Sequence, residues 1–184
     1  MGSRYESLRD DQIDFIKDQK IFFVGTAAND GTINVSPKGW DSLRVMDANR
    51  IVWRNITGSG NETAAHLAQN SRMTMMFCAF VGKPKILRLY GEAHAYHRRD
   101  DAFAELDSLF EPHKSSRQLV DFRFDLVQTS CGFGVPFFEY QTERENMDMW
   151  LEPQTDEDIE SYWEKKNTVS LDGNPTYIFG DGHE

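Results

Sequence analysis

Cysteine and histidine are scarce in this chain, and their spacing excludes several kinds of site. The two cysteines, Cys78 and Cys131, lie far apart and form no CxxC pair. This pattern excludes a disulfide framework and fits a reducing compartment, so we expect a cytoplasmic protein. Of the five histidines, His94 and His97 come closest to a metal-ligand spacing. They do not match a recognised ligand pattern, and we expect no metal site.

Positive charge is also in short supply. The chain has 20 Lys and Arg against 30 Asp and Glu, for a net charge of −10. Such an acidic protein lacks the electrostatic footprint that nucleic acids or anionic membranes require, so we expect neither as a partner. An anionic ligand can still bind where basic side chains gather.

Long hydrophobic runs are absent. No apolar stretch approaches the roughly 20 residues of a membrane span, and the N-terminus lacks the order of a signal peptide. The composition is 39% hydrophobic and 12% aromatic, which is typical of a folded globular protein. We expect a single domain over residues 1–184, with a C-terminal helical extension from about residue 141.

The most informative stretch is 55–67, where an apolar run enters a small polar loop that leads into a predicted helix at 62–69. A strand, a loop and a helix N-terminus in this order present free backbone N–H groups to an anion. Gly58 and Gly60 permit a close approach of the backbone. The same segment supplies short polar side chains, namely Asn55, Thr57, Ser59, Asn61 and Thr63.

An ordinary helix cap by Ser59 or Asn61 explains this loop equally well, and both interpretations stay open. The loop matches neither GxxxxGK[ST] nor GxGxxG, which disfavours nucleotide sites of those two kinds.

Two predicted strands carry polar groups in informative positions. After an Asp30-Gly31 hairpin turn, the strand at 32–38 places Asn34, Ser36 and Lys38 on one face. This face either lines a ligand site or meets water. In the strand at 85–96, Arg88 sits between apolar neighbours, where an unpaired guanidinium is costly to bury. It either pairs with Glu92 or holds an anionic ligand.

Short turns join most of the predicted strands, which indicates a mainly β, antiparallel barrel with helices at its rim. A parallel sheet would need helical crossovers that these turns cannot contain. We expect strands at 21–27, 32–38, 43–45, 51–54, 72–80, 85–96 and 122–128. We expect helices at 8–18, 62–69, 100–109, 146–152 and 156–166, and a polar linker at 111–117.

The order of these features resembles the pyridoxamine 5′-phosphate oxidase-like, FMN-binding split-barrel superfamily. The resemblance covers about residues 15–95 and includes Val35-Ser36-Pro37-Lys38-Gly39, the polar loop with its helix, and Arg88-Leu89-Tyr90-Gly91. Segments 131–136, 166–167 and 171–176 resemble a less-studied subgroup. The chain departs from the oxidase itself: Gly60-Asn61 replaces the basic residues of its phosphate loop, and its C-terminal Arg-x-His signature is missing. These departures argue against pyridoxamine phosphate as the substrate.

The resemblance implies a six-stranded antiparallel split β-barrel that forms a homodimer, with FMN at the subunit interface. Carried over to this sequence, the cofactor-binding residues are Ser36, Lys38, Asn55, Thr57, Ser59, Asn61, Thr63 and Arg88. Trp40, Trp53 and Tyr90 are candidates to pack near a planar ring.

The activity implied by the resemblance is an FMN-dependent oxidoreductase that acts on a small-molecule substrate. The cofactor carries the chemistry, so no protein residue is assigned a catalytic role. Cys131 is interpreted as a buried structural residue or a redox partner, and His66 as structural or a phosphate-side donor. The alternatives are a non-catalytic flavin-, deazaflavin- or heme-binding module, and a cofactor-free interaction barrel.

Overall fold

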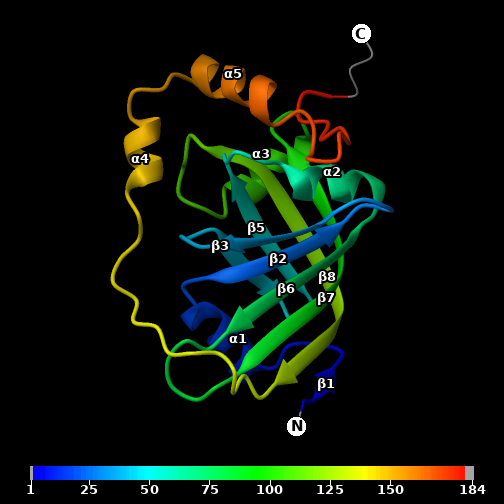
Figure 1. The fold of residues 1–184 in the computed structure, drawn as a ribbon, viewed down its shortest axis with the longest axis vertical. Coiled ribbons are helices and arrows are strands. Elements are labelled where there is room, and N and C mark those ends of the chain that lie inside the picture. The colour runs from blue at the N-terminus through cyan, green and yellow to red at the C-terminus, as the bar shows by residue number, and fades with distance from the viewer. Residues whose placement is uncertain (1, 181–184) are drawn as a thin grey trace.

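The computed structural model describes residues 2–180 and consists mainly of one antiparallel sheet (Figure 1). Its strand order is β3-β2-β6-β7-β8-β5-β4, and β1 pairs with β8. The strands are β1 (Arg4–Tyr5), β2 (Phe22–Ala27), β3 (Ile33–Lys38), β4 (Leu43–Asp47), β5 (Arg50–Ile56), β6 (Arg72–Cys78), β7 (Ile86–His97) and β8 (Ser116–Ser130). The predicted mainly β, antiparallel architecture is confirmed, with eight strands in the sheet rather than six.

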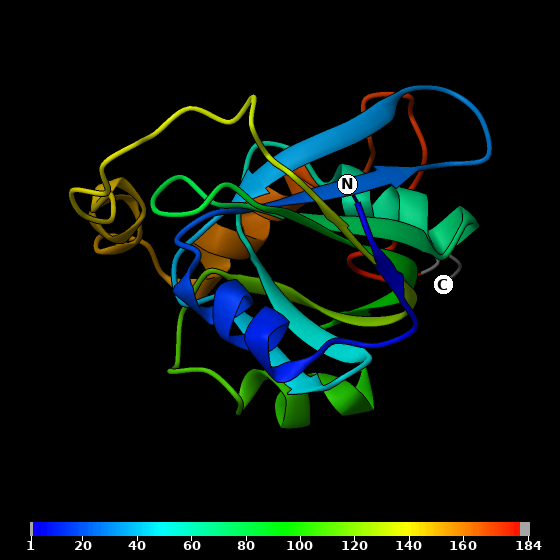
Figure 2. The ribbon, with the colours of Figure 1, turned by 90° about the horizontal axis from the view of Figure 1, so that it is seen from below.

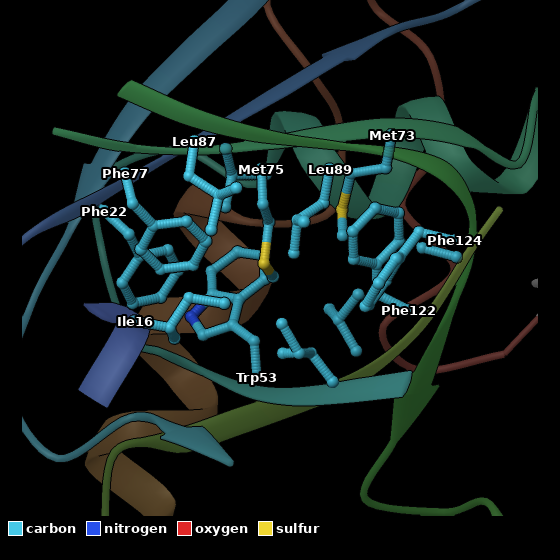
Figure 3. Close-up of a cluster of buried hydrophobic side chains, with 14 of the residues drawn as sticks. Ile16, Phe22, Trp53, Met73, Met75, Phe77, Leu87, Leu89, Phe122 and Phe124 are labelled. Carbon is cyan, nitrogen blue, oxygen red and sulfur yellow. The ribbon is translucent and has the colours of Figure 1, made fainter. Parts of the chain in front are cut away.

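The sheet curls so that β2 and β6 lie across a core from β4 and β5 (Figure 2). Alternating side chains of the strands point into this core, as their period of two requires. Trp53, Phe77, Met75 and Phe122 are buried in its centre, and Ile16 of helix α1 (Asp10–Asp18) closes one end (Figure 3). Burial of each such side chain stabilises the fold by about 1.5–3 kcal/mol.

Strand β8 begins earlier than predicted, so the predicted linker at 111–117 is wrong at its C-terminal end. Ser116 pairs with Ile56, and Gln118 pairs with Asn55, at the start of a long ladder between β8 and β5. The first residues of β8 are polar yet buried, because they hydrogen-bond inside the protein. Hydropathy alone therefore gives no strand signal there. Strand β1, which has two residues, also escaped prediction.

Strand β7 contains a bulge between Tyr90 and Gly91. A Cβ atom at Gly91 would clash with the backbone of the neighbouring strand β8, so glycine fits this close approach. Leu87 and Leu89 point into the core, which leaves Arg88 on the outer face, where it donates to Ser130 Oγ at 3.1 Å. The alternative that Arg88 pairs with Glu92 is therefore wrong.

The helices lie at the rim and on the outside of the sheet. Helix α2 (Glu62–Gln69) contacts β2 and β7, and α3 (Asp101–Asp107) packs on β7 and β8. Helices α4 (Asn146–Leu151) and α5 (Asp156–Lys166) form a separate hydrophobic cluster with Ile178. In Figure 1, α5 lies at the same end of the barrel as α2. Within residues 2–180, none of the helices combines the length and hydropathy of a membrane span.

Candidate functional site

A polar cavity of about 370 Å³ lies where strand β3 runs beside the loop before helix α2. Every predicted cofactor ligand except Arg88 contributes to its lining, which is a single site built from β3, β5 and the loop. These lining residues are Ser36, Lys38, Asn55, Thr57, Ser59, Asn61 and Thr63. Arg88 does not line the cavity, because it projects from the outer face of β7.

The loop presents its backbone to this cavity. Within the described part of the chain, the N–H groups of residues 58–62 donate no hydrogen bond. Asn61 is the N-cap of helix α2, but its side chain does not cap the helix. Unpaired N–H groups at the positive end of a helix dipole form a favourable environment for an anion.

The base of the cavity is a network of buried amides. Gln118 of β8 accepts a hydrogen bond from Asn55 Nδ2 at 2.9 Å, and it donates to Asn61 Oδ1 at 3.1 Å. Asn61 Nδ2 in turn donates to the carbonyl oxygen of Asn167 at 3.0 Å. The side chains of Asn55 and Asn61 are thus engaged in holding the loop. Both side chains are therefore part of the base of the cavity.

Thr57 has a similar structural role. Its hydroxyl donates to Ser115 O at 3.1 Å and accepts a hydrogen bond from the indole of Trp163 at 2.9 Å. Thr63, at the other side of the loop, accepts from Asn34 Nδ2 at 3.4 Å. The side chains of Thr57 and Thr63 are buried and already have hydrogen-bonding partners.

The β3 wall differs from the base because Ser36 and Lys38 make no hydrogen bond or ion pair to a described residue, although Asn34 of the same strand donates to Thr63. Ser36 Oγ is buried and makes no hydrogen bond. Lys38 Nζ lies 4.9 Å from the centroid of the Trp53 ring. Burial, with a smaller contribution from nearby Arg117, lowers the pKa of Lys38 to about 8. Across the cavity mouth, the side chain of Ser59 is exposed and unbonded within the described residues.

The lining contains three charged residues that are not predicted from the sequence, Arg54, Glu62 and Arg117. Among these, Arg117 is the cation that donates to carbonyl oxygens of the loop. It was placed in the predicted polar linker, yet it lies on β8, lines the cavity and is only 3% exposed. Burial lowers its pKa to about 10. The signal in the sequence was weak, because an arginine in a polar stretch usually meets solvent.

The cavity is locally positive although the protein is acidic. Among residues 2–180, no carboxylate forms an ion pair with Lys38 or Arg117. Glu62 also lines the cavity, and its two carboxylate oxygens share the N–H of Leu171, at N···O distances of 3.0 and 3.1 Å. Half-buried Lys38 and buried Arg117, neither with an ion-pair partner among the described residues, favour an anionic ligand.

The segment after α5 fastens several parts of the site together. Asp172 Oδ2 accepts from Thr32 N at 2.8 Å and Thr32 Oγ1 at 2.7 Å, at the tip of the β2–β3 hairpin. Val169 and Pro175 form an isolated bridge that folds this segment into a tight turn. The motif at 166–176, singled out in the sequence, therefore braces both the hairpin and the loop.

The remaining candidates are divided by location. Trp40 and Trp53 line the cavity, whereas Tyr90 lies on the outer face of the sheet and donates to Gln128 Oε1 at 3.1 Å. Cys131 is exposed, so its interpretation as a buried residue is wrong. His66 is fully buried behind the loop, with Nδ1 at 3.1 Å from Thr26 Oγ1.

The residues present fit a phosphorylated planar cofactor. Residues with unpaired backbone N–H groups, Ser36 with its orphaned hydroxyl, and the cations Lys38 and Arg117 all line one space, which suits a phosphate. Indole rings adjoin the same space and offer a surface for an aromatic ring. In the described part of the chain, no three metal-ligating side chains gather in a cluster.

Comparison with known proteins gives a consistent result. Residues 8–131 match the family model of pyridoxamine 5′-phosphate oxidase. The chain is 35% identical over 158 residues to the pyridoxamine 5′-phosphate oxidase family protein ustO of Aspergillus flavus. This match covers 83% of the chain, which spans only 60% of the length of that relative.

Two solved structures share the fold. A candidate pyridoxamine 5′-phosphate oxidase from Lactobacillus delbrueckii has a TM-score of 0.54 and 18% identity, covering 67% of this chain and 94% of that one. A Clostridium acetobutylicum protein related to general stress protein 26, of the pyridoxinephosphate oxidase family, has a TM-score of 0.50 and 16% identity. It covers 66% of this chain and 86% of its own.

Proposed function

The chain belongs to the pyridoxamine 5′-phosphate oxidase family, and from this premise we propose that it binds FMN in the cavity between β3 and the loop. The observation that carries the proposal is the set of unpaired donors on the β3 wall. Ser36 Oγ and Lys38 Nζ face loop N–H groups that also lack partners. A phosphate between them would satisfy all three kinds of donor at once.

Trp40 and Trp53, which line the same cavity, would offer aromatic surface to the isoalloxazine ring. When bound, the flavin supplies the redox chemistry, and the protein orients it and limits its contact with water. We propose that the protein is an oxidoreductase of a small organic substrate. Lys38 and the loop dipole hold charge at the phosphate end, and no side chain of the lining is assigned to proton transfer.

A heme-binding function has less support from this cavity. Its lining, as the structure describes it, contains no histidine, cysteine or methionine that could serve as an axial ligand. A deazaflavin, which also carries a phosphate, would satisfy the same donors. The identity of the ring therefore has to be measured.

An absorbance spectrum of the purified protein tests the proposal directly, followed by mass identification of the chromophore released on denaturation. We expect flavin absorbance and the mass of FMN, or tight binding of added FMN. Bleaching by NAD(P)H or another donor would support turnover, and a bound flavin that no donor reduces would indicate a binding module. Absence of flavin after reconstitution with excess FMN would contradict the proposal.

We also propose that the protein is a homodimer that buries the outer face of β2 and β3. Ile33 and Val35 of β3 are 76% and 66% exposed, although both are apolar. Apolar side chains in this position are typical of an interface. Arg88 lies on the outer side of the same sheet, so its predicted contact with the cofactor depends on a second subunit. Light scattering should give a dimer mass, and Val35→Asp should shift it toward the monomer.

A further inference from the structure

The loop that faces the proposed phosphate lacks a basic side chain of its own. Residues 57–61 read Thr-Gly-Ser-Gly-Asn. Arg117 reaches this loop from strand β8, and its Nη1 donates to the carbonyl oxygens of Gly60 at 3.0 Å and Gly58 at 3.5 Å. A guanidinium is thus placed directly against the loop, although it comes from a strand far away in the sequence.

Only two of the three guanidinium nitrogens of Arg117 donate hydrogen bonds to described residues. Nε donates to Gln118 Oε1 at 3.0 Å, and Nη1 also donates to Asn167 Oδ1 at 2.7 Å. Nη2 makes no hydrogen bond to any described residue, and it is not among the buried unsatisfied atoms, so it retains access to the cavity that Arg117 lines. A buried guanidinium with no carboxylate partner and one free donor is ready to bind an anion.

Asn167, in the segment after helix α5, holds both the arginine and the loop. Its Oδ1 accepts from Arg117, its Nδ2 donates to Gly58 O at 3.0 Å, and its carbonyl oxygen accepts from Asn61 Nδ2 at 3.0 Å. Thr176 Oγ1 donates to the same carbonyl at 2.6 Å. One residue of the C-terminal segment therefore positions the guanidinium relative to the loop backbone.

We infer that Arg117 is a second phosphate-binding cation of this site beside Lys38, replacing the basic side chains absent from the loop, and that Asn167 is its positioning residue. This inference rests on the proposed function. It makes the segment after α5 a part of the cofactor site, because the arginine fork depends on Asn167. The phosphate would accept a charge-assisted hydrogen bond from Nη2, opposite the donors of the β3 wall.

The test compares FMN with riboflavin, which has the same ring and no phosphate, by fluorescence titration of the full chain. Arg117→Gln should weaken FMN binding about 10- to 100-fold, the usual effect of losing a charge-assisted hydrogen bond. Its riboflavin affinity should change little. A purely structural arginine would affect both flavins equally, and that result would overturn the inference.

Arg98→Gln is the matched control. Arg98 also donates to backbone carbonyls near the start of β8, Ser116 O at 2.9 Å and Lys114 O at 2.6 Å, and packs on Trp163. It does not line the cavity. We expect this variant to bind FMN as the parent does. Equal losses of FMN affinity in Arg98→Gln and Arg117→Gln would also overturn the inference.

Asn167→Asp keeps the shape of the side chain and places a carboxylate against the guanidinium. It should lower FMN affinity about tenfold while riboflavin binding persists, because the charge of Arg117 is then neutralised. It provides the test if Arg117→Gln does not fold, and an unchanged FMN affinity would contradict the inference. If the parent and its variants bind FMN equally well, only the role of Arg117 and Asn167 is contradicted. If the parent binds no flavin, the proposed function is contradicted as well.

Discussion

The base and the β3 wall of the cavity have similar polar compositions but opposite hydrogen-bonding states. At the base, Asn55, Thr57 and Asn61 are buried and fully engaged with Gln118, Trp163 and the C-terminal segment. On the wall, Ser36 and Lys38 have neither a hydrogen-bonding nor an ionic partner among the described residues. The base is therefore part of the hydrogen-bonded fold, whereas Ser36 and Lys38 on the wall have polar atoms that no described residue satisfies.

This contrast predicts that substitutions at the base reduce stability and that substitutions on the wall reduce ligand affinity. Buried donors that lose a partner are destabilising, whereas donors without a protein partner can be removed without harm to the fold. The predictions below test that division from the largest expected effect to the smallest.

The largest effect is expected for Asn61→Leu at the base. It removes both hydrogen bonds of the Asn61 side-chain amide. Gln118 Nε2 and the carbonyl oxygen of Asn167 each lose one hydrogen-bonding partner. We expect the free energy of unfolding to fall by about 2–4 kcal/mol, since each unsatisfied buried group costs about 1–3 kcal/mol. Urea denaturation should show a lower midpoint with an unchanged slope. Ser59→Ala, at an exposed position of the same loop, is the control and should leave the midpoint unchanged.

Lys38→Met on the wall should have the opposite effect on stability. It replaces a half-buried, unpaired ammonium by an apolar side chain of similar length, which should stabilise the apo protein by about 1–2 kcal/mol. FMN affinity should fall at least about tenfold through loss of a charge-assisted contact. Thermal unfolding without ligand and flavin titration measure the two effects. A variant that is less stable and binds FMN normally would reverse the assignment of the wall.

In the parent protein, apo stability and FMN affinity should change in opposite directions with pH. The pKa of Lys38 is about 8 in the folded protein, against 10.5 for a free lysine side chain. Between these values the folded state releases a proton that the unfolded state keeps, so this residue makes apo stability rise with pH over that window. FMN affinity should fall over the same window as the ammonium loses its charge. Lys38→Met should flatten both slopes, measured by urea denaturation and fluorescence titration.

The difference between base and wall also shows which features of the site can be predicted from the sequence. Local patterns predicted the hairpin, the loop, helix 62–69 and the cavity-facing side of β3, because each depends on residues close together in the chain. Whether each polar group is hydrogen-bonded depends instead on residues that are distant in the sequence. Asn61 bonds to Asn167 across 106 positions, and Arg117 to Gly60 across 57.

Arg117 illustrates why the rest was missed. In the sequence it lies in a polar segment, and no nearby residue indicates that β8 begins at Ser116, one residue before Arg117. Its burial follows from strand pairing with β5 and from coverage by the segment after α5. Likewise, Cys131 was weighed as a small buried hydrophobe, but it follows the end of β8 and is exposed.

The smallest expected effect is that of Ser36→Ala, and it makes the sharpest distinction between the two regions. A hydroxyl with an ordinary structural role leaves an unsatisfied partner when it is removed, but Ser36 Oγ has no partner in the protein. Its removal should therefore leave the free energy of unfolding unchanged or raise it by up to about 1 kcal/mol. FMN affinity should fall by about three- to tenfold, because one hydrogen bond from a neutral hydroxyl to the phosphate is lost, and riboflavin affinity should not change. If apo stability instead falls as it does in Asn61→Leu, the β3 wall is part of the structural network, and the division between base and wall does not hold.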